Sequence, residues 1–307
     1  MLTETKRGEA SERAGTELEA SRREIDRVLA AFLEAELVGA PDEVGDVLRH
    51  AVLGPGKRLR PLLFTAAYRT AGGRNPEVAT LACSVELVHT YSLIHDDLPC
   101  MDDDTLRRGR PALHVRFGVG PAVLAGAALL PLAIRALWVG GERLGLLERA
   151  VRRLARTLTV AAGGAGMAGG QLRDLRAEGR RLSCAELEEI HRGKTAGLMA
   201  ASAVMGGVTA AAPASLLRRL RTFGDRLGLA FQTVDDLLDT GEVRPGGPGG
   251  RREDVPPATA TGPAVLGTEA ARVRVQTLAR EAREALRAVP DSGLLEGLLG
   301  LALDRTS

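Results

Sequence analysis

Apolar residues recur at helical spacing along most of this chain, whereas alternation of the strand type is scarce. The segment REIDRVLAAFLEAEL, residues 23–37, places its apolar side chains on one face of a helix. Similar patterns predict helices over residues 44–52, 59–70, 75–98, 121–140, 147–163, 167–176, 185–191, 195–208, 213–229, 230–239 and 269–289. A short apolar helix closes the chain. The predicted fold class is therefore all-α.

Turn and capping residues divide these helices and set the domain organisation. Ser183, followed three residues later by Glu186, predicts a capping box at the start of a helix. Residues 1–20 are polar, and we expect a flexible tail there. Residues 241–264 are rich in Gly and Pro, which predicts a lid or a disordered loop. Residues 21–307 then form one domain without internal repeats.

Composition narrows the possible functions. Aromatic residues are only 3% of the chain, so the core must be built from Ala, Leu, Val and Gly. A net charge of +2 argues against a nucleic-acid binder. Three scattered cysteines indicate a reducing compartment, and the charged N-terminus does not resemble a signal peptide, so we expect a cytoplasmic protein. The apolar stretch 119–134 is shorter than the ~20 residues of a membrane span, so no transmembrane segment is expected.

Two clusters of aspartates are the main candidate for chemistry. The first lies in HDDLPCMDDDTLRRGRP, and the second lies in FQTVDDLLDT. Asp235 and Asp239 share one face of a helix, whereas Asp236 points elsewhere and is expected to support them. Either cluster alone could be a solvated surface run. Together, with oxygen ligands only, they suit Mg²⁺, which binds through a few carboxylates and a substrate's phosphates.

Three basic segments accompany the acids. They are Arg107 and Arg108 after the first cluster, GPGKRLRP at residues 54–61, and HRGKT at residues 191–195. Each could be an ordinary basic turn, but guanidinium groups also suit phosphate oxygens. His89 and His95 are six residues apart, a spacing that does not favour joint metal binding. Acids for Mg²⁺, bases for phosphate and an apolar helical core together indicate an amphiphilic diphosphate as the substrate.

The chain resembles the trans-isoprenyl diphosphate synthases of the short-chain farnesyl and geranylgeranyl type. The resemblance covers about residues 45–285, and its motifs are GPGKRLRP, VELVHTYSLIHDDLPCMDDDTLRRGRP, GMAGGQLRDL, HRGKTAGLM and GLAFQTVDDLLD. It implies a single-domain bundle of helices around a deep apolar central cavity, usually as a homodimer. It also implies condensation of isopentenyl diphosphate with an allylic diphosphate, dimethylallyl or geranyl diphosphate, in the presence of Mg²⁺.

The resemblance also assigns roles to individual residues. Isopentenyl diphosphate would be bound by Lys57, Arg60, His89 and Arg108. The allylic diphosphate would be bound by Arg107, Gln171, Lys194, Thr195 and Gln232. The Mg²⁺ ions, three with bound diphosphate, would be held by Asp96, Asp97, Asp102, Asp235 and Asp239, with Asp174 in support. Arg107, Lys194 and the three aspartates Asp96, Asp102 and Asp235 would be catalytic.

Product length in this family is implied to depend on the cavity floor, here Tyr91 and Ser92. An aromatic residue at Tyr91 favours the C15 product farnesyl diphosphate, and the C20 product geranylgeranyl diphosphate stays open. The chain departs from the family pattern at Ala127, where an aspartate is usual, and at Pro131 inside an apolar helix. Residues 240–268 also lack the usual lysines, for which arginines of that loop could substitute.

Two other functions are compatible with parts of this pattern. A terpene-synthase-like cyclase would ionise a prenyl diphosphate, but it would not need the residues assigned to isopentenyl diphosphate. A non-catalytic partner subunit would not need both aspartate clusters.

Overall fold

The structure is a computed structural model, and it describes the backbone of residues 2–239 and 265–303. Side chains are described from residue 12 to residue 238 and from 265 to 303. The helices in the first half are α1 (Leu2–Glu36), α2 (Asp42–Val52), α3 (Leu59–Thr70), α4 (Val78–Asp96), α5 (Leu113–Phe117) and α6 (Val119–Arg143). Those in the second half are α7 (Glu148–Ala162), α8 (Met167–Ala177), α9 (Cys184–His191), α10 (Gly197–Thr209), α11 (Ala214–Asp239), α13 (Thr268–Leu286) and α14 (Gly293–Leu303).

Two short elements interrupt the helices. A π-helical turn, η1 (Arg192–Ala196), joins α9 to α10. A two-stranded hairpin, β1 (Leu106–Arg107) and β2 (Arg110–Pro111), follows the first aspartate cluster, with Leu106 opposite Pro111. The predicted all-α class is confirmed, and neither short element was predicted.

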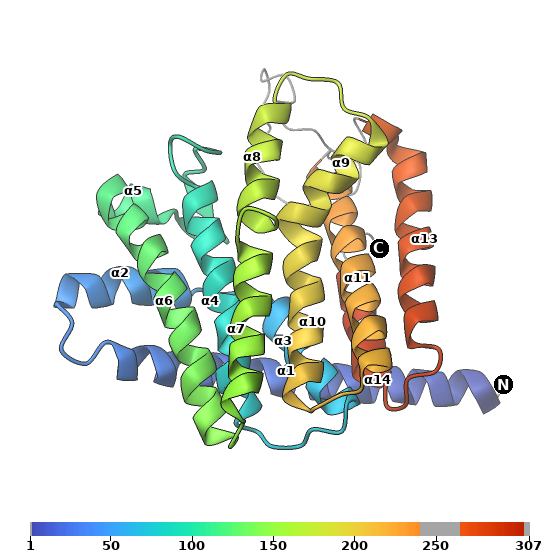
Figure 1. The fold of residues 1–307 in the computed structure, drawn as a ribbon. Coiled ribbons are helices and arrows are strands. Elements are labelled where there is room, and N and C mark those ends of the chain that lie inside the picture. The colour runs from blue at the N-terminus through green and yellow to red at the C-terminus, as the bar shows by residue number, and fades with distance from the viewer. Residues whose placement is uncertain (1, 240–264, 304–307) are drawn as a thin grey trace.

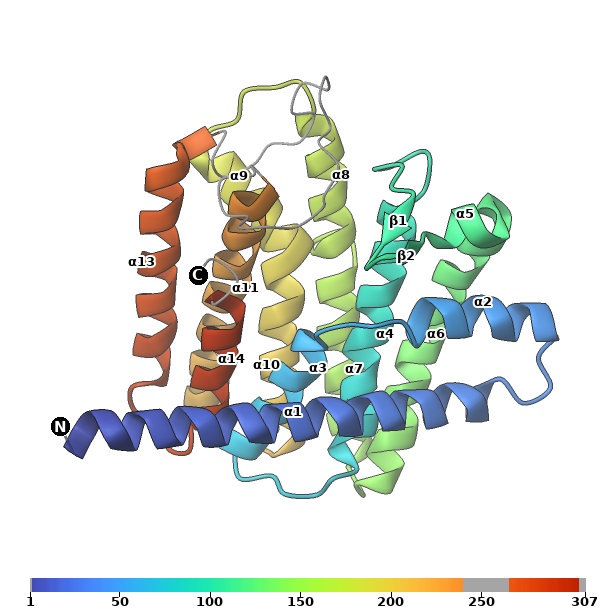
Figure 2. The same ribbon diagram turned by 180° about the vertical axis from the view of Figure 1, so that it is seen from behind.

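The helices form a bundle, and α1 lies across one end of it (Figures 1 and 2). The centre is formed by α3, α4 and α10, whose apolar residues are buried on nearly all sides, as expected for core helices. Outer helices bury one stripe only. In α7 the buried residues Val151, Leu154, Leu158 and Ala161 recur every three or four positions. The apolar pattern of each helix therefore matches its depth in the bundle.

The close contact between α3 and α10 depends on a glycine. A Cβ atom at Gly206 would lie 2.1 Å from the Phe64 carbonyl oxygen and 2.9 Å from the Tyr68 amide nitrogen. Both are backbone atoms, which cannot move aside as the end of a flexible side chain can. Glycine at this position lets the two central helices pack backbone to backbone.

Some boundaries differ from the sequence predictions. In place of a flexible tail over residues 1–20, α1 is helical from Leu2, and Ala14 and Leu18 are buried near Gly297 of α14. The two helices predicted over 213–229 and 230–239 are one continuous helix, α11. The capping box at Ser183 and Glu186 is confirmed at the start of α9. The predicted lid at 241–264 lies outside the described residues.

One described helix, α6, is long and apolar enough to cross a membrane by length and composition. It continues through Pro131 without ending, as the helix predicted over residues 121–140 required. In the structure α6 packs against α4, and Ala122, Leu129 and Ala136 are completely buried. These contacts make α6 a part of the bundle.

Candidate active site

The first aspartate cluster lies where α4 ends. The turn after the helix is closed by the Asp102 amide, which donates a hydrogen bond of 2.9 Å to the Asp96 carbonyl. Adjacent helical residues point about 100° apart, so Asp96 and Asp97 face different sides. Asp96 lines a cavity shared with Lys194, whereas Asp97 is 3% exposed and faces Arg107.

Arg107 and Asp97 hold each other. The Arg107 Nε donates to Asp97 Oδ1 at 2.8 Å, and its Nη2 donates to Asp97 and, at 2.7 Å, to Asp104. These contacts fix the β1–β2 hairpin to the end of α4. Asp97 was predicted to bind metal and Arg107 to bind phosphate. Both roles stay predictions, since in this structure the two side chains pair.

The turn η1 carries Lys194 toward the first cluster. Its Nζ contacts Asp174 Oδ2 of α8 at 2.8 Å. Burial lowers the pKa of Lys194, but the carboxylates of Asp174, Asp96 and Asp102 outweigh this effect and leave the pKa raised. Lys194 is therefore a stable cation among three carboxylates. α8 approaches η1 closely at Gly170, where a Cβ atom would lie 2.2 Å from the Lys194 amide nitrogen.

The next residue of η1 faces the second cluster on α11. The Thr195 hydroxyl donates to Gln232 Oε1 at 2.7 Å, and Gln232 Nε2 donates to Asp236 Oδ1 at 3.1 Å. Asp236 also lies 3.3 Å from His191 Nε2. Asp236 is buried and engaged on both sides, and the supporting role predicted for it stays a prediction. The side chain of Asp239 is not among those described.

The two clusters thus meet at one end of the bundle. Helices α4 and α11 run in the same direction and end at the same side, as Figures 1 and 2 show. Lys194 and Thr195 are neighbours in the chain, and they contact groups beside the first and the second cluster respectively. Asp235 acts electrostatically on Arg60, which belongs to the basic part of the site. The ends of α4 and α11 therefore bring the two aspartate clusters to one side of the bundle, and their joint binding of Mg²⁺ stays a prediction.

Burial makes the first cluster receptive to a cation. Removal from water raises the pKa of Asp96 to about 6, although Lys194 and Arg107 oppose this effect. Partial burial also raises the pKa of Asp102, against the attraction of Lys194. Among the described residues, no three His, Cys, Asp or Glu side chains are gathered tightly enough to hold a metal by themselves. The oxygen-only donors fit Mg²⁺ held jointly by a few carboxylates and a bound phosphate.

The basic part of the site contains an unusual arginine. Arg60 is 9% exposed, its Nε has no hydrogen-bond partner within the described part of the chain, and burial lowers its pKa to about 10. Beside it, burial and the nearby Arg60 and Arg108 hold the pKa of His89 well below its usual value, so His89 is neutral at pH 7. Arg108 Nη2 lies 3.5 Å from His89 Nε2. A buried cation of this kind is best satisfied by an anionic ligand.

A cavity of about 170 Å³ opens beside Asp96 and Lys194, between α4 and α8. Its wall includes Tyr91, Ser92 and Gln171, together with apolar residues of α8. The Gln171 amide is buried, and neither its nitrogen nor its oxygen has a partner among the described residues. Tyr91 packs edge-on against His95 with ring centroids 4.6 Å apart. The arrangement suits a diphosphate at the charged mouth and an apolar tail in the cavity.

Two groups at this site were not assigned from the sequence. The first is His191, which pairs with Asp236. The second is Arg58 with Glu86, an ion pair at 2.6 Å whose side chains are 3% and 1% exposed. Both Arg58 and Glu86 lie inside quoted motifs, so their motif positions were visible, but their pairing across the fold was not.

Comparison with known proteins identifies the family of the chain. A family model described as polyprenyl synthetase matches residues 41–280. The chain is 40% identical over 265 residues to geranylgeranyl pyrophosphate synthase 12, chloroplastic, from Arabidopsis thaliana, covering 85% of this chain and 73% of that protein. It is also 40% identical over 218 residues to farnesyl diphosphate synthase from Bacillus subtilis (strain 168), covering 71% and 73%.

Solved structures are similar over nearly their full length. A geranyltransferase from Legionella pneumophila has a TM-score of 0.84 at 28% identity, covering 96% of this chain and 99% of that one. A geranyltransferase from Helicobacter pylori, in complex with magnesium and isoprenyl diphosphate, has a TM-score of 0.78 at 32% identity, covering 94% and 96%. The chain belongs to the trans-isoprenyl diphosphate synthase family. It is an all-α trans-prenyltransferase.

Proposed function

We propose that this prenyltransferase condenses isopentenyl diphosphate with dimethylallyl or geranyl diphosphate, and that farnesyl diphosphate is its main product. Buried Arg60 carries this proposal, because its Nε has no partner among the described residues and it lies beside His89 and Arg108. Together with Lys57, which is three residues before Arg60 in the chain, these residues would bind the diphosphate of the isopentenyl substrate. A guanidinium buried in this way is stabilised by an anionic ligand.

The allylic diphosphate would lie on the other side, among Lys194, Thr195, Gln232, Gln171 and Arg107. Three Mg²⁺ ions would be held by Asp96, Asp97, Asp102, Asp235 and Asp239, and they would neutralise the leaving diphosphate. Arg107 would have to exchange its contact with Asp97 for a phosphate oxygen. Cations around the leaving group favour ionisation of the allylic C–O bond. The protein positions the isopentenyl double bond to attack the resulting carbocation.

The step then ends with loss of a proton from the new carbon chain, which the departed diphosphate would accept. Because its lowered pKa makes His89 a weak base, His89 can donate a hydrogen bond to the isopentenyl diphosphate without taking up that proton. The apolar wall contributed by α8 excludes water from the carbocation. A cyclase would need no second diphosphate site, so the cluster of Arg60, His89 and Arg108 favours elongation.

Product length is proposed to depend on Tyr91 and Ser92 in the cavity wall. Tyr91 lies five residues before Asp96, about 7.5 Å deeper along the helix. The cavity of about 170 Å³ is smaller than ordinary ligand pockets of roughly 300–1,000 Å³, so side chains must move to admit a tail. Tyr91→Ala is expected to lengthen the product toward geranylgeranyl diphosphate. An unchanged product would contradict the role of Tyr91.

The direct test is incubation of the pure protein with Mg²⁺, an allylic diphosphate and isopentenyl diphosphate, followed by mass spectrometry. An elongated diphosphate is expected, and a cyclic hydrocarbon or alcohol would instead identify a cyclase.

Asp96→Ala and Asp235→Ala should each remove most turnover while the circular dichroism spectrum stays unchanged. Full turnover in either variant would refute the metal assignment.

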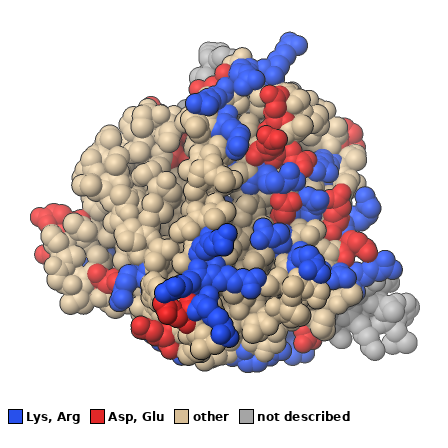
Figure 3. All heavy atoms as spheres, in the orientation of Figure 1, with Lys and Arg blue, Asp and Glu red and all other residues tan. Residues whose placement is uncertain are grey.

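We also propose a homodimer. Large apolar side chains on α5 and α6 are exposed, including Val115 at 50% and Leu124 at 71%. Figure 3 shows that the face over these helices carries few charged residues, whereas Lys and Arg gather elsewhere. Leu124→Glu is expected to shift the mass measured by light scattering toward the monomer. The cytoplasmic location stays a prediction.

A further inference from the structure

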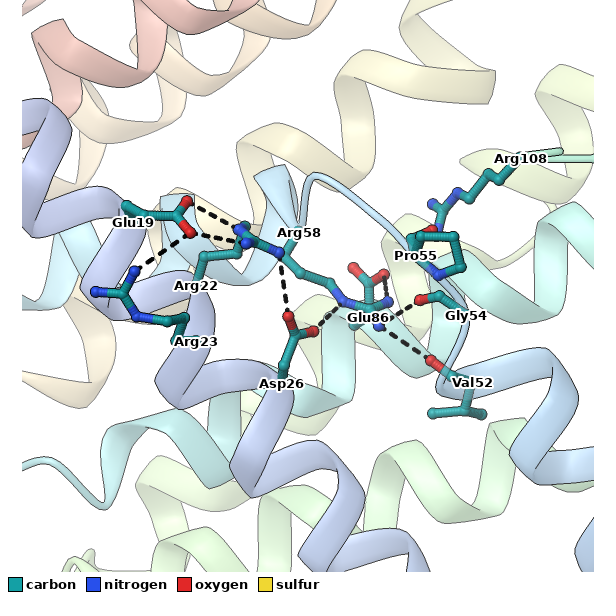
Figure 4. A network of polar contacts seen from close by, with 10 residues as sticks. All are labelled: Glu19, Arg22, Arg23, Asp26, Val52, Gly54, Pro55, Arg58, Glu86 and Arg108. Carbon is teal, nitrogen blue, oxygen red and sulfur yellow. Dashed lines mark hydrogen bonds and ion pairs between the residues drawn. The ribbon is translucent and has the colours of Figure 1, made fainter.

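Arg58 occupies an unusual position between α2 and α3. Its side chain is only 3% exposed, and its φ of 50° is in the left-handed region, which residues with a side chain rarely adopt. Its guanidinium donates from Nε to Asp26 Oδ1 at 2.7 Å and from Nη1 to Glu86 Oε1 at 2.6 Å (Figure 4). A backbone conformation of this kind persists only where its surroundings fix it.

The same guanidinium also holds the loop before α3. Its Nη2 donates to the carbonyl of Val52 at 3.2 Å and to that of Gly54 at 2.9 Å. Arg108 Nη1 donates to the next carbonyl, that of Pro55, at 3.1 Å. Figure 4 shows Arg58 extended between α1 on one side and this loop on the other. Loop, α1 and α4 are thus joined through one planar group with a rigid donor geometry.

Arg58 and Arg60 are two residues apart, and they differ in how their charges are compensated. Arg58 contacts two carboxylates, so its charge is satisfied within the protein. Arg60 is buried, and its Nε is without a partner in the described part of the chain. Arg58 is therefore suited to hold the backbone, and Arg60 is suited to meet a ligand.

Glu86 connects this network to His89, which lies on the α4 side of the proposed isopentenyl site. It lies three residues before His89 in α4, so both side chains share one face of that helix. Arg58 in turn directly precedes α3 and follows Lys57 in the chain. Moving the Arg58–Glu86 contact would change the placement of Lys57 and Arg60 relative to His89.

We propose that Arg58, Asp26 and Glu86 form a positioning network, which sets the spacing of the groups that bind isopentenyl diphosphate without touching that substrate. This inference rests on the isopentenyl pocket proposed above. It predicts a defect specific to one substrate, because the allylic side is positioned by η1, α8 and α11. A general loss of packing would affect both substrates.

Glu86→Gln tests the network, since it keeps the size of the side chain and removes the charge facing Arg58. The KM for isopentenyl diphosphate is expected to rise roughly tenfold, a modest loss beside the hundredfold that a 1 Å misplacement can cause. The KM for geranyl diphosphate should stay within about twofold, and the pattern should be reproduced more weakly by Asp26→Asn. Asp26→Asn also serves if Glu86→Gln does not fold, since its carboxylate is 38% exposed.

Glu17→Gln is the matched control. Glu17 forms an α1–α3 ion pair with Arg69 at 2.6 Å, away from the loop, and its loss should leave both KM values unchanged.

Lys57→Ala, measured in parallel, tests the pocket itself. If Lys57→Ala raises the KM for isopentenyl diphosphate and Glu86→Gln and Asp26→Asn do not, the positioning network is wrong and the pocket stands. If Lys57→Ala has no effect, the pocket and the inference built on it both fail. Equal increases in both KM values, or a lower kcat alone, would show a merely structural role.

Discussion

Replacing Asp96 with asparagine is expected to stabilise the metal-free protein while removing its turnover. Burial raises the pKa of Asp96 from 3.8 to about 6, so the folded state resists ionisation of this carboxyl group. At ~1.4 kcal/mol for each tenfold change in proton affinity, ionisation at pH 7 costs the fold about 3 kcal/mol. Asparagine has no charge to bury, and therefore avoids this cost. For a protein of this length, about 3 kcal/mol corresponds to a rise in Tm of roughly 5 °C.

The pH dependence gives the prediction its sign. Because the folded-state pKa is raised, the ionisation cost is absent below pH 3.8 and reaches its full value above about pH 6. The stability gain of Asp96→Asn, measured by thermal or urea unfolding in EDTA, should therefore be full at pH 7.5 and about 1 kcal/mol at pH 4.5. Added Mg²⁺ with diphosphate should raise the Tm of the wild type more than that of the variant.

Asp46→Asn is the control, since the Asp46 side chain is 71% exposed and its contact with Arg49 is long, at 3.5 Å. Its stability should change by no more than about 0.5 kcal/mol at either pH. A variant Asp96→Asn that is no more stable than wild type at pH 7.5 would refute the argument. So would a gain of the same size at pH 4.5.

Three glycine and capping positions give further predictions. Gly170→Ala would place a Cβ atom 2.2 Å from the Lys194 amide nitrogen. We expect kcat to fall at least roughly tenfold in steady-state assays, because Lys194 would be displaced. A kcat equal to that of the wild type would contradict the need for this close contact. Gly206→Ala would place a Cβ atom 2.1 Å from the Phe64 carbonyl oxygen. The free energy of unfolding in urea should fall by about 2–4 kcal/mol. A fall of less than about 1 kcal/mol would show that α3 and α10 can move apart at little cost. Ser183→Ala removes a helix cap and should cost about 1 kcal/mol with unchanged kcat, whereas a change in kcat would link this cap to the site.

Local features of the fold were predictable because their physical causes lie within a few residues. The capping box at Ser183 needs only the spacing to Glu186, and α7 needs only its repeating apolar residues. The start of α1 was missed for the opposite reason. Ala14 and Leu18 look isolated in a polar segment, and they are buried only because α14, near the other end of the chain, packs against them.

The candidate site shows the same difference between features with local causes and features that depend on distant contacts. Its chemistry could be predicted, since carboxylates, guanidinium groups and amides in these motifs favour a cation and a diphosphate. The sequence did not predict which of these groups pair with one another. Arg107 contacts Asp97, and Arg58 contacts Glu86, although nothing in the two motifs distinguishes these arginines from Arg60. Partners are chosen by the packing of α1, α3 and α4, and packing depends on contacts far apart in sequence.

The turn η1 has a mechanical consequence for the two halves of the site. Lys194 contacts Asp174 on α8, and Thr195 contacts Gln232 on α11, with a single peptide unit between the two residues. The peptide unit between them keeps its length and planarity, so the distance between the two Cα atoms is fixed. A displacement of η1 would therefore act on both contacts together, the one with α8 and the one with α11.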